Sequence, residues 1–413
     1  VTDRIFVAVG YAASNVSMIL GETGLIIIDT TESTKAASNI LTEFRKLTNL
    51  PVKTILYTHS HRDHVSGATV FSEGREVEII ARKNFDPDLT PVQGQTPRPS
   101  KHMLDRTRRQ FGIGLNSSER VNLGLGPGDR PTEGMGAGFL MPNHWIGEQP
   151  ETLERDGVTL ELHPAPGETE DHVVIWLAKE RILFSGDNFY KSFPNLYAIR
   201  GTRYRDFDIW ADTLEKLAEF GAELMIPGHS RPVRGKGEVS ERLHDYAAAI
   251  RQIIRQTVEG MNQGLGLEEI ARKVQLPDSL AAKPWLKEFY GTVEWAVKAY
   301  FVGNVGWFDG NPTRLFPLPL SEKAEVLVRL AGGEAAVWDE VNLAQQQGKH
   351  QLVLELLELL EGVEADPIRV TEAKLLAFRV LADQQINATA RNYYLSCAKE
   401  LEAGIVQKAS DTQ

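Results

Sequence analysis

Three histidines and an aspartate lie within six residues in the segment 58–64, which reads THSHRDH. Imidazole and carboxylate groups are ligands that zinc favours in proteins. On an extended backbone His59, His61 and Asp63 share one face, whereas His64 points the other way. This spacing suits two neighbouring metal ions, with His59 and His61 on one and Asp63 and His64 on the other. A solvated polar loop is the alternative interpretation, but nothing in packing calls for such a cluster.

Further side chains of the metal-ligand type occur in three later turns, each beside an apolar run. They are Glu168 in Pro-Gly-Glu, Asp187 in Phe-Ser-Gly-Asp and His229 in Pro-Gly-His. Any one of them alone is more often an ordinary turn residue. Together, and in this order, they are predicted to complete the metal site. His172, four residues beyond Glu168, is an alternative ligand that we rank lower.

The elements that must position these side chains alternate between strands and helices in the first half of the chain. Short apolar runs predict buried strands, and apolar residues at helical spacing predict helices. The predicted strands cover 4–10, 15–20, 25–28, 52–57, 158–162, 173–178 and 181–185, with a short apolar run at 224–226. Helices are predicted at 34–47 and from Val65 onward. This half of the chain therefore belongs to a layered α/β or α+β domain.

From about residue 239 the pattern is helical, with apolar residues at helical spacing between Leu243 and Val258. No convincing strand pattern follows. A break rich in proline and glycine occupies 306–319, and 341–362 and 369–403 resemble two helical hairpins of similar composition. Such similarity indicates a stacked-helix repeat.

A glycine-rich stretch at 122–138 predicts a long irregular loop inside the first half. Loops of this length within a domain tend to be functional or disordered.

The change of pattern near residue 236 divides the chain into an α+β domain over 1–235, which carries the predicted metal site, and an all-α domain over 236–413.

The composition is that of a globular protein with an acidic surface. Apolar residues make up 42% of the 413 residues, and the net charge is −11 with a pI near 5.5. Nucleic acid is an unsuitable partner, because phosphate contacts need clustered lysine and arginine. An anionic substrate must be held by local cations, since the overall field repels it. The single cysteine, Cys397, excludes a disulfide within the chain and a cysteine-based zinc site.

No apolar run approaches the ~20 residues that a membrane span needs. The chain opens Val1-Thr2-Asp3 without a methionine, so we expect a trimmed or processed N-terminus. The lack of disulfides is compatible with both the cytoplasm and the periplasm. The compartment therefore stays open.

The motif HSHRDH resembles the HxHxDH signature of the metallo-β-lactamase superfamily. The segments 24–30, 184–187 and 227–229 are similar to that family's opening strand, its metal-bridging aspartate segment and its last histidine. The resemblance implies an αββα sandwich over about 1–235 with the site at one edge of its two sheets. It also implies two zinc ions per chain, bridged by a hydroxide and by Asp187. The implied ligands are His59, His61, Asp63, His64, Glu168, Asp187 and His229.

Glu168 stands where most members of the superfamily have a histidine, and a glutamate there is a feature of the alkylsulfatase branch. That branch usually has a glutamate as the bridging ligand, whereas this chain has Asp187. The metal ligands alone therefore leave the branch open.

Two further segments resemble alkylsulfatases. Residues 192–206, SFPNLYAIRGTRYRD, are similar to their sulfate-binding stretch, with Arg200 at the arginine that holds the sulfate. Arginine suits a sulfate monoanion, because its planar fork matches such oxygens. Residues 300–313, YFVGNVGWFDGNPT, resemble the GWFDGNP stretch of the helical dimerisation domain, and 290–291 and 391–395 are similar to the same domain. The resemblance implies a homodimer through the helical half.

The implied activity is the zinc-dependent hydrolysis of a small alkyl sulfate ester to an alcohol and inorganic sulfate by the bridging hydroxide. Asp63 and Arg200 are the expected catalytic residues. The expected substrate-binding residues are Arg200, Asn195, Tyr197 and Arg205. A hydrolase of another ester, a thioester or a lactone is the alternative. Known alkylsulfatases carry a third, lipid-binding-like domain that we do not expect in this chain, so the length of the alkyl substrate stays open. The sequence does not decide between primary and secondary esters, or between C–O and S–O cleavage.

Overall fold

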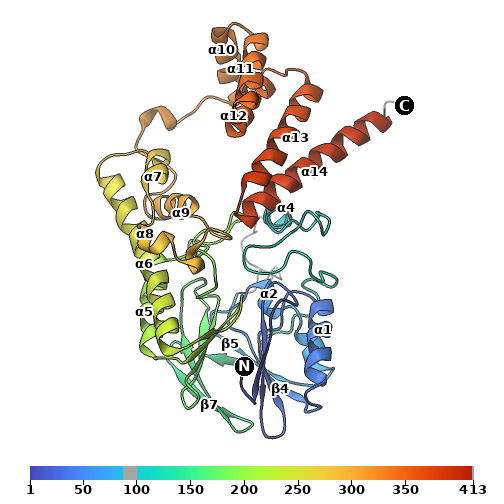
Figure 1. Cartoon of the computed structure of the whole chain (residues 1–413), viewed down its shortest axis with the longest axis vertical. Coiled ribbons are helices and arrows are strands. Elements are labelled where there is room, and N and C mark those ends of the chain that lie inside the picture. The colour runs from blue at the N-terminus through green and yellow to red at the C-terminus, as the bar shows by residue number, and fades with distance from the viewer. Residues whose placement is uncertain (87–99, 412–413) are drawn as a thin grey trace. The chain divides into compact units, whose positions relative to one another are not determined.

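The computed structural model describes residues 1–86 and 100–411, and two six-stranded sheets form its first part (Figure 1). The first sheet has the order β1-β2-β3-β4-β5-β6, and the second has the order β12-β11-β10-β9-β8-β7. The strands of the first sheet are β1 (Ile5–Ala8), β2 (Val16–Leu20), β3 (Leu25–Ile28), β4 (Val52–Leu56), β5 (Glu78–Arg82) and β6 (His144–Ile146). Those of the second are β7 (Glu151–Arg155), β8 (Val158–Pro164), β9 (Val173–Leu177), β10 (Ile182–Gly186), β11 (Leu224–Pro227) and β12 (Val233–Arg234).

Each sheet contains a parallel section at the point where the metal-ligand candidates follow the strands. In the first sheet β3, β4, β5 and β6 pair in parallel, whereas β1, β2 and β3 pair antiparallel. In the second sheet β10 and β11 are parallel, and the other neighbours are antiparallel. Parallel strands end at the same edge of a sheet, so the residues after β4, β10 and β11 emerge at sheet edges.

Strands β3, β9 and β10 are buried on both faces, because their side chains alternate between two hydrophobic cores. In β3, Ile26 and Ile28 join a core shared with β8, β9 and β10, whereas Leu25 and Ile27 join a core on the opposite face of the first sheet. In the same way Phe184 of β10 faces the shared core. The two sheets therefore pack face to face.

Helices cover the outer face of each sheet. On the first sheet, α1 (Thr34–Arg45) and α3 (Ala68–Ser72) contribute to the outer core, and on the second, α5 (Phe207–Glu219) and α6 (Lys236–Asn262) do so (Figure 1). Ser33 begins α1 by accepting a hydrogen bond from the backbone N–H of Ala36. Such N-caps satisfy a donor that the first helical turn leaves free. The predicted αββα sandwich is confirmed.

Several elements differ from the sequence prediction. Strands β5, β6, β7 and β12 were not predicted, because each is short and lies among charged and polar residues. The helix expected from Val65 is two helices, α2 (Arg62–Val65) and α3, and α2 begins inside the histidine motif. The stretch 122–138 holds no helix or strand of the sheets, as expected for a long loop.

After α6 the described residues form helices joined by loops and contain no strand, as predicted. The first half also contains the helix α4 (Ser100–Gln110). The later elements are α7 (Leu267–Lys273), α8 (Asp278–Ala281), η1 (Pro284–Leu286), α9 (Val293–Val305), η2 (Pro312–Arg314), α10 (Leu320–Ala331), α11 (Glu334–Gln346), α12 (His350–Gly362), α13 (Pro367–Gln384) and α14 (Ala388–Asp411). No helix in residues 1–86 and 100–411 is both long and apolar enough to cross a membrane.

The contacts divide the chain into two compact units. Unit 1 comprises 1–99, 121–198 and 202–304, and unit 2 comprises 100–120, 199–201 and 305–413. Helices α6 to α8 therefore pack with the sheets in unit 1, where Leu243 and Ile250 of α6 share a core with α5. The domain division at residue 235 stays a prediction.

Unit 2 has two hydrophobic clusters of its own. Val328, Val353 and Leu357 belong to a cluster that joins α10, α11, α12 and the start of α13. A smaller cluster contains Leu115, Ala382 and Leu395, and Arg109 of α4 forms an ion pair with Glu400 of α14 at 2.7 Å. The helical hairpins expected at 341–362 and 369–403 correspond to α11–α12 and α13–α14.

Candidate metal centre

The loop after β4 carries the first four candidate ligands. His59 and His64 are fully buried, and His61 is half-buried at the N-terminus of α2. Thr58 fixes the start of this loop, because its backbone N–H and its hydroxyl both donate to the Asp29 carboxylate, at 2.8 and 2.9 Å. The Ser14 hydroxyl donates to the backbone carbonyl of Asp63. The loop is therefore held at both ends by residues that follow other strands.

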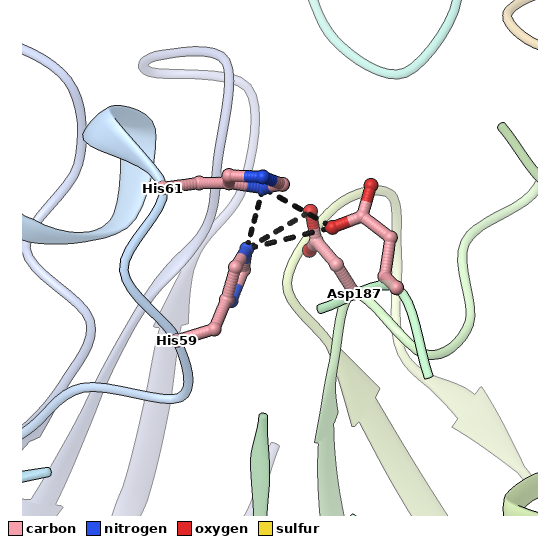
Figure 2. Close-up of side chains that lie close together, drawn as sticks. His59, His61 and Asp187 are labelled. Carbon is pink, nitrogen blue, oxygen red and sulfur yellow. Dashed lines mark hydrogen bonds and ion pairs between the residues drawn. The ribbon is translucent and has the colours of Figure 1, made fainter. Parts of the chain in front are cut away.

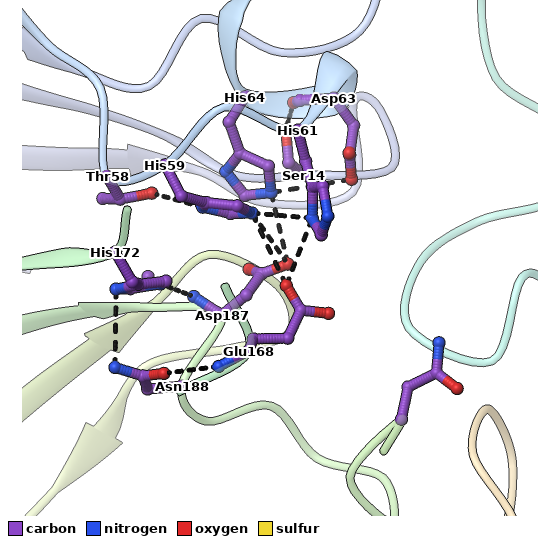
Figure 3. Close-up of polar contacts among 12 residues, drawn as sticks. Ser14, Thr58, His59, His61, Asp63, His64, Glu168, His172, Asp187 and Asn188 are labelled. Carbon is purple, nitrogen blue, oxygen red and sulfur yellow. Dashed lines mark hydrogen bonds and ion pairs between the residues drawn. The ribbon is translucent and has the colours of Figure 1, made fainter. Parts of the chain in front are cut away.

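The remaining three candidates come from the second sheet. Glu168 lies in the turn between β8 and β9, Asp187 follows β10 directly, and His229 follows β11. Because β10 and β11 are parallel neighbours, Asp187 and His229 leave the sheet side by side. All three side chains are buried. The two sheets therefore present their candidate ligands toward a common point, and Figure 3 shows Glu168 and Asp187 of the second sheet facing the histidines of the first.

One group of ligand atoms contains His59, His61, Glu168 and Asp187 (Figure 2). One potential ligand atom from each lies within 4.8 Å of the others. The Glu168 Oε2 atom is 3.2 Å from His61 Nδ1 and 3.6 Å from His59 Nε2. Two imidazoles and two carboxylates at these separations can surround one cation of the zinc type.

A second group contains Asp63, His64 and His229, with potential ligand atoms that again lie within 4.8 Å of one another. The Asp63 Oδ2 atom is 3.6 Å from His64 Nε2 and 3.3 Å from His229 Nε2. Asp187 Oδ2 lies 3.3 Å from His64 Nε2, 3.0 Å from His229 Nε2 and 3.8 Å from His59 Nε2. The Asp187 carboxylate therefore faces both groups at once.

Second partners orient the imidazole rings. The Nδ1 atom of His229 donates to the Ala13 carbonyl at 2.6 Å, and Nδ1 of His64 lies 2.7 Å from the Asp29 carboxylate. A neutral ring that donates through Nδ1 keeps its Nε2 lone pair free to bind a metal. In both rings Nε2 is the atom that points at the carboxylates of the second group.

Several buried ligand atoms are unsatisfied in the described residues. The Nε2 atom of His64, Oε2 of Glu168 and Oδ1 of Asp187 have no hydrogen-bond partner there. Buried polar atoms without a partner are rare, and each calls for an explanation such as an ion. These three atoms belong to the two groups of candidate ligands, so the donor set fits bound metal.

The electrostatics of the second group favour positive charge. Burial acts to lower the pKa of His229, but the Asp187 carboxylate and the hydrogen bond to it raise that pKa to about 10. Burial and the neighbouring rings of His64 and His61 lower the pKa of His59 well below its usual value. His59 is therefore neutral, as a metal ligand must be. The raised pKa of His229 reports a negative potential that would equally attract a divalent cation.

His172, the lower-ranked alternative ligand, lies outside both groups. Its Nε2 atom accepts a hydrogen bond from the backbone N–H of Asp187 at 3.0 Å, which uses that lone pair (Figure 3). Burial lowers the pKa of His172 to about 4, so the ring stays neutral. The geometry gives His172 the task of holding the Asp187 backbone, and it favours Glu168 as the ligand.

The four residues that were predicted to bind substrate belong to two different units. Asn195 is buried in unit 1, Tyr197 is half-buried in the same unit, and Arg205 is buried against Glu168. Arg200 belongs to unit 2, where its backbone N–H donates to the Gln110 side chain at 2.8 Å. The substrate-binding roles stay predictions.

Sequence reasoning missed residues that support the centre from a distance. Arg82 of β5 is buried and donates to the carbonyl of Glu170 at 2.6 Å, in the turn that carries Glu168. Glu32 accepts from the backbone N–H of Ala13 at 2.9 Å and from buried Arg130 at 2.6 Å. Arg130 lies in the glycine-rich loop, so that loop is tied to the residue that orients His229. Among the supporting residues only Asp29 carries a signal that could have been used in the sequence, because its carboxylate directly follows a buried strand.

Comparisons with known proteins agree with this geometry. Residues 9–229 match the metallo-beta-lactamase superfamily model, and residues 266–404 match the alkyl sulfatase dimerisation model. A linear primary-alkylsulfatase from a Pseudomonas species is 36% identical over 93% of this chain and 73% of its own length. The chain belongs to the alkylsulfatase branch of the metallo-β-lactamase superfamily. The earlier identification of this family is therefore confirmed.

Other alkylsulfatases match over nearly the whole chain. The alkyl/aryl-sulfatase BDS1 of Saccharomyces cerevisiae is 31% identical over 99% of this chain. The solved structure of the stereoselective inverting sec-alkylsulfatase Pisa1 from a Pseudomonas species superposes with a TM-score of 0.86 at 27% identity, over 97% of this chain. The chain spans 64% of the length of each of these two relatives.

Proposed function

We propose that this alkylsulfatase-family chain hydrolyses alkyl sulfate esters to an alcohol and inorganic sulfate, with two zinc ions as cofactors. The observation that carries the proposal is the pair of ligand groups that share Asp187, within a chain that resembles alkylsulfatases along most of its length. Zinc is the metal proposed because imidazole and carboxylate donors at these separations suit it. When bound, the two ions would supply a water-derived nucleophile at neutral pH and offset negative charge on the ester.

The proposed ligands of one ion are His59, His61, Glu168 and Asp187. Those of the other are Asp63, His64, His229 and Asp187. The three orphaned buried atoms of this set support the assignment. Asp63 has one further proposed role: its carboxylate, which is the least buried of the three acidic ligands, orients the attacking water.

Substrate recognition is proposed to depend on a small number of local cations and polar groups. Arg200 holds the sulfate group, because its planar guanidinium matches the tetrahedral oxygens and its charge offsets theirs in an otherwise acidic protein. Asn195 and Tyr197 lie in the same segment and are proposed to contact the ester. Arg205 is proposed below to act through Glu168.

A homodimer through the helical half is proposed as the assembly. The match to the dimerisation model supports it, and so do large apolar side chains exposed in unit 2. Trp307, Phe316 and Leu330 are 70%, 92% and 76% exposed in the isolated chain. Exposed apolar side chains of this size mark interaction surfaces. Light scattering on the eluting protein should give twice the mass of the chain.

The function is tested by sulfate release from a panel of primary and secondary alkyl sulfates, with and without a zinc chelator. Chelator-sensitive release from the wild-type chain, and none from His59→Ala, is the expected result. Nitrocefin, an acyl thioester and a lactone are assayed beside the sulfates. Hydrolysis of one of these compounds without sulfate release would show that the chain acts on another ester, a thioester or a lactone instead.

A further inference from the structure

Arg205 and Glu168 form an ion pair beside the first group of candidate ligands. The Nη1 atom of Arg205 donates to Glu168 Oε1 at 2.8 Å, and both side chains are 3% exposed. The same nitrogen donates to the backbone carbonyl of Asn195 at 2.5 Å. A buried charge pair needs good geometry and additional hydrogen bonds, and Arg205 Nη1 supplies both, whereas its Nε atom has no partner in the described residues.

The pair divides the two oxygens of Glu168 between two tasks. Oε1 is bonded to Arg205, whereas Oε2 faces His61 Nδ1 at 3.2 Å and has no hydrogen-bond partner in residues 1–86 and 100–411. The backbone of Glu168 is fixed as well, because its N–H donates to the Asn188 side chain at 3.1 Å. One oxygen of the carboxylate is thus turned toward the metal group and held there.

The charges of the pair also matter. Apart from Glu168 and the shared Asp187, the proposed ligands of this group are His59 and His61. An imidazole that binds a metal ion is neutral. Glu168 alone would add a negative charge to a buried site, but Glu168 and Arg205 together add none. The 2.8 Å distance between Arg205 Nη1 and Glu168 Oε1, with both side chains buried, places the two charges in direct contact.

We propose that Arg205 is a positioning residue of the metal centre: it holds Glu168 as a ligand through one oxygen and cancels its charge, so that the pair replaces a single neutral ligand. The inference rests on the metal roles in the proposed function, and it gives Arg205 a different role from the substrate contact predicted from sequence. Arg205 stands directly before Asp206, which caps α5 by accepting from the N–H of Ile209. The helix start therefore anchors the backbone that carries the guanidinium.

The first test compares Arg205→Met with Arg203→Met in the full-length chain. Arg203 lies two residues away, is largely exposed and pairs with Asp86 on the surface. Zinc affinity is measured by competition with a chromophoric chelator, and zinc content by elemental analysis. Arg205→Met should weaken one of two zinc sites by about tenfold to a hundredfold, the usual effect of losing a residue that supports a ligand. Arg203→Met should match wild type, and Arg205→Lys should recover part of the loss.

The second test is a double-variant cycle that stays informative if Arg205→Met folds poorly. Glu168→His alone leaves the Arg205 cation unpaired beside the site and should also weaken zinc binding. Glu168→His combined with Arg205→Met restores a neutral ligand without a stray charge. Its zinc affinity should return to within about twofold of wild type. The loss of affinity in the double variant should therefore be much smaller than the sum of the losses in the two single variants.

Two results would overturn the inference. One is a set of additive losses in the cycle. The other is an Arg205→Met variant with both zinc ions bound at wild-type affinity and only a raised KM for the sulfate ester, which would return Arg205 to substrate binding. Failure of the proposed function looks different: the zinc cycle behaves as expected, but the wild-type chain releases no sulfate from any ester of the panel.

Discussion

The Nδ1 atom of His64 lies 2.7 Å from the Oδ2 atom of Asp29, the residue that directly follows β3. Asp29 also accepts two hydrogen bonds from Thr58, so one carboxylate holds both ends of the histidine loop. Because the ring donates through Nδ1, its Nε2 atom is turned toward Asp63 and Asp187. A residue from a neighbouring strand thus decides which nitrogen of His64 can bind a metal.

Asp29→Asn should therefore weaken zinc binding. The amide offers one acceptor oxygen where the carboxylate offers two, so either Thr58 or His64 loses its partner. We expect a loss of about tenfold to a hundredfold in zinc affinity, measured by chelator competition. Asp3→Asn, at an exposed position, is the control and should bind as wild type does. Equal affinities for the two variants would show that Asp29 does not orient the ring.

Gly228→Ala should disrupt the metal centre through steric overlap alone. A Cβ atom at Gly228 would lie 2.2 Å from Asp187 Oδ1 and 2.9 Å from His64 Cε1, which is closer than real Cβ contacts come. The shared Asp187 must then move, so we expect the variant to lose bound zinc and activity together. Gly237→Ala is the matched control, because nothing lies within 4 Å of its Cβ position. Full zinc content in Gly228→Ala would contradict the role given to Asp187.

Arg130→Met should destabilise unit 1, although the residue lies in a long loop. Glu32 and Arg130 are both buried, and removing the cation leaves a buried carboxylate without its counterion. The expected cost is about 3–5 kcal/mol in the free energy of unfolding. Lys101→Met breaks an exposed pair with Asp105 and should leave the free energy of unfolding close to the wild-type value, because solvent screens such a pair. Urea denaturation followed by tryptophan fluorescence measures both, and equal midpoints would rule out a structural role for the buried pair.

Arg200→Ala should separate substrate binding from metal binding. If Arg200 holds the sulfate, its loss removes charge-assisted hydrogen bonds worth about 1.5–3 kcal/mol. The KM for an alkyl sulfate should then rise roughly tenfold to a hundredfold, while zinc content stays at the wild-type value. Arg203→Ala serves as the control on the same segment. An unchanged KM in Arg200→Ala would remove Arg200 from the sulfate site.

Metal removal should lower stability as well as activity. Without bound cations the buried carboxylates of Glu168 and Asp187 lie near that of Asp63, which is 30% exposed and faces the same His64 and His229 rings as Asp187 does. Zinc at a thousandfold excess over its dissociation constant stabilises a folded chain by about 4 kcal/mol for each site. Chelation should therefore lower the melting temperature, and added zinc should restore it. A chelated protein that melts as the loaded one does would argue against bound metal.

The histidine motif was the part of the centre most easily predicted from sequence. Its donors lie within six residues, so the local spacing of His59 to His64 already limits their geometry. Glu168, Asp187 and His229 could be proposed because each follows or precedes an apolar strand, and because their order resembles a known family. Their closeness to the histidines depends on the packing of two sheets, which a single sequence does not reveal.

The supporting residues could not be predicted, because their roles depend on long-range partners. Arg82 and Glu170 are 88 residues apart, and Arg130 and Glu32 are 98 apart. From the sequence alone, each of the charged residues Arg82, Arg130 and Glu32 is predicted to be solvated. Their burial depends on the fold and not on their neighbours in the chain. The strand β5 was missed for a similar reason: its sequence EIIAR is short and ends in charges, and its parallel neighbours β4 and β6 stabilise it.

The uneven distribution of the donors along the chain affects how zinc couples to folding. Four of them lie within six residues, so even a denatured chain keeps a segment able to chelate a metal ion. Glu168, Asp187 and His229 join them only when both sheets have formed. Metal held by the denatured state subtracts from the stability that metal gives the native state. A thermal shift on adding zinc will therefore understate the affinity of the folded site.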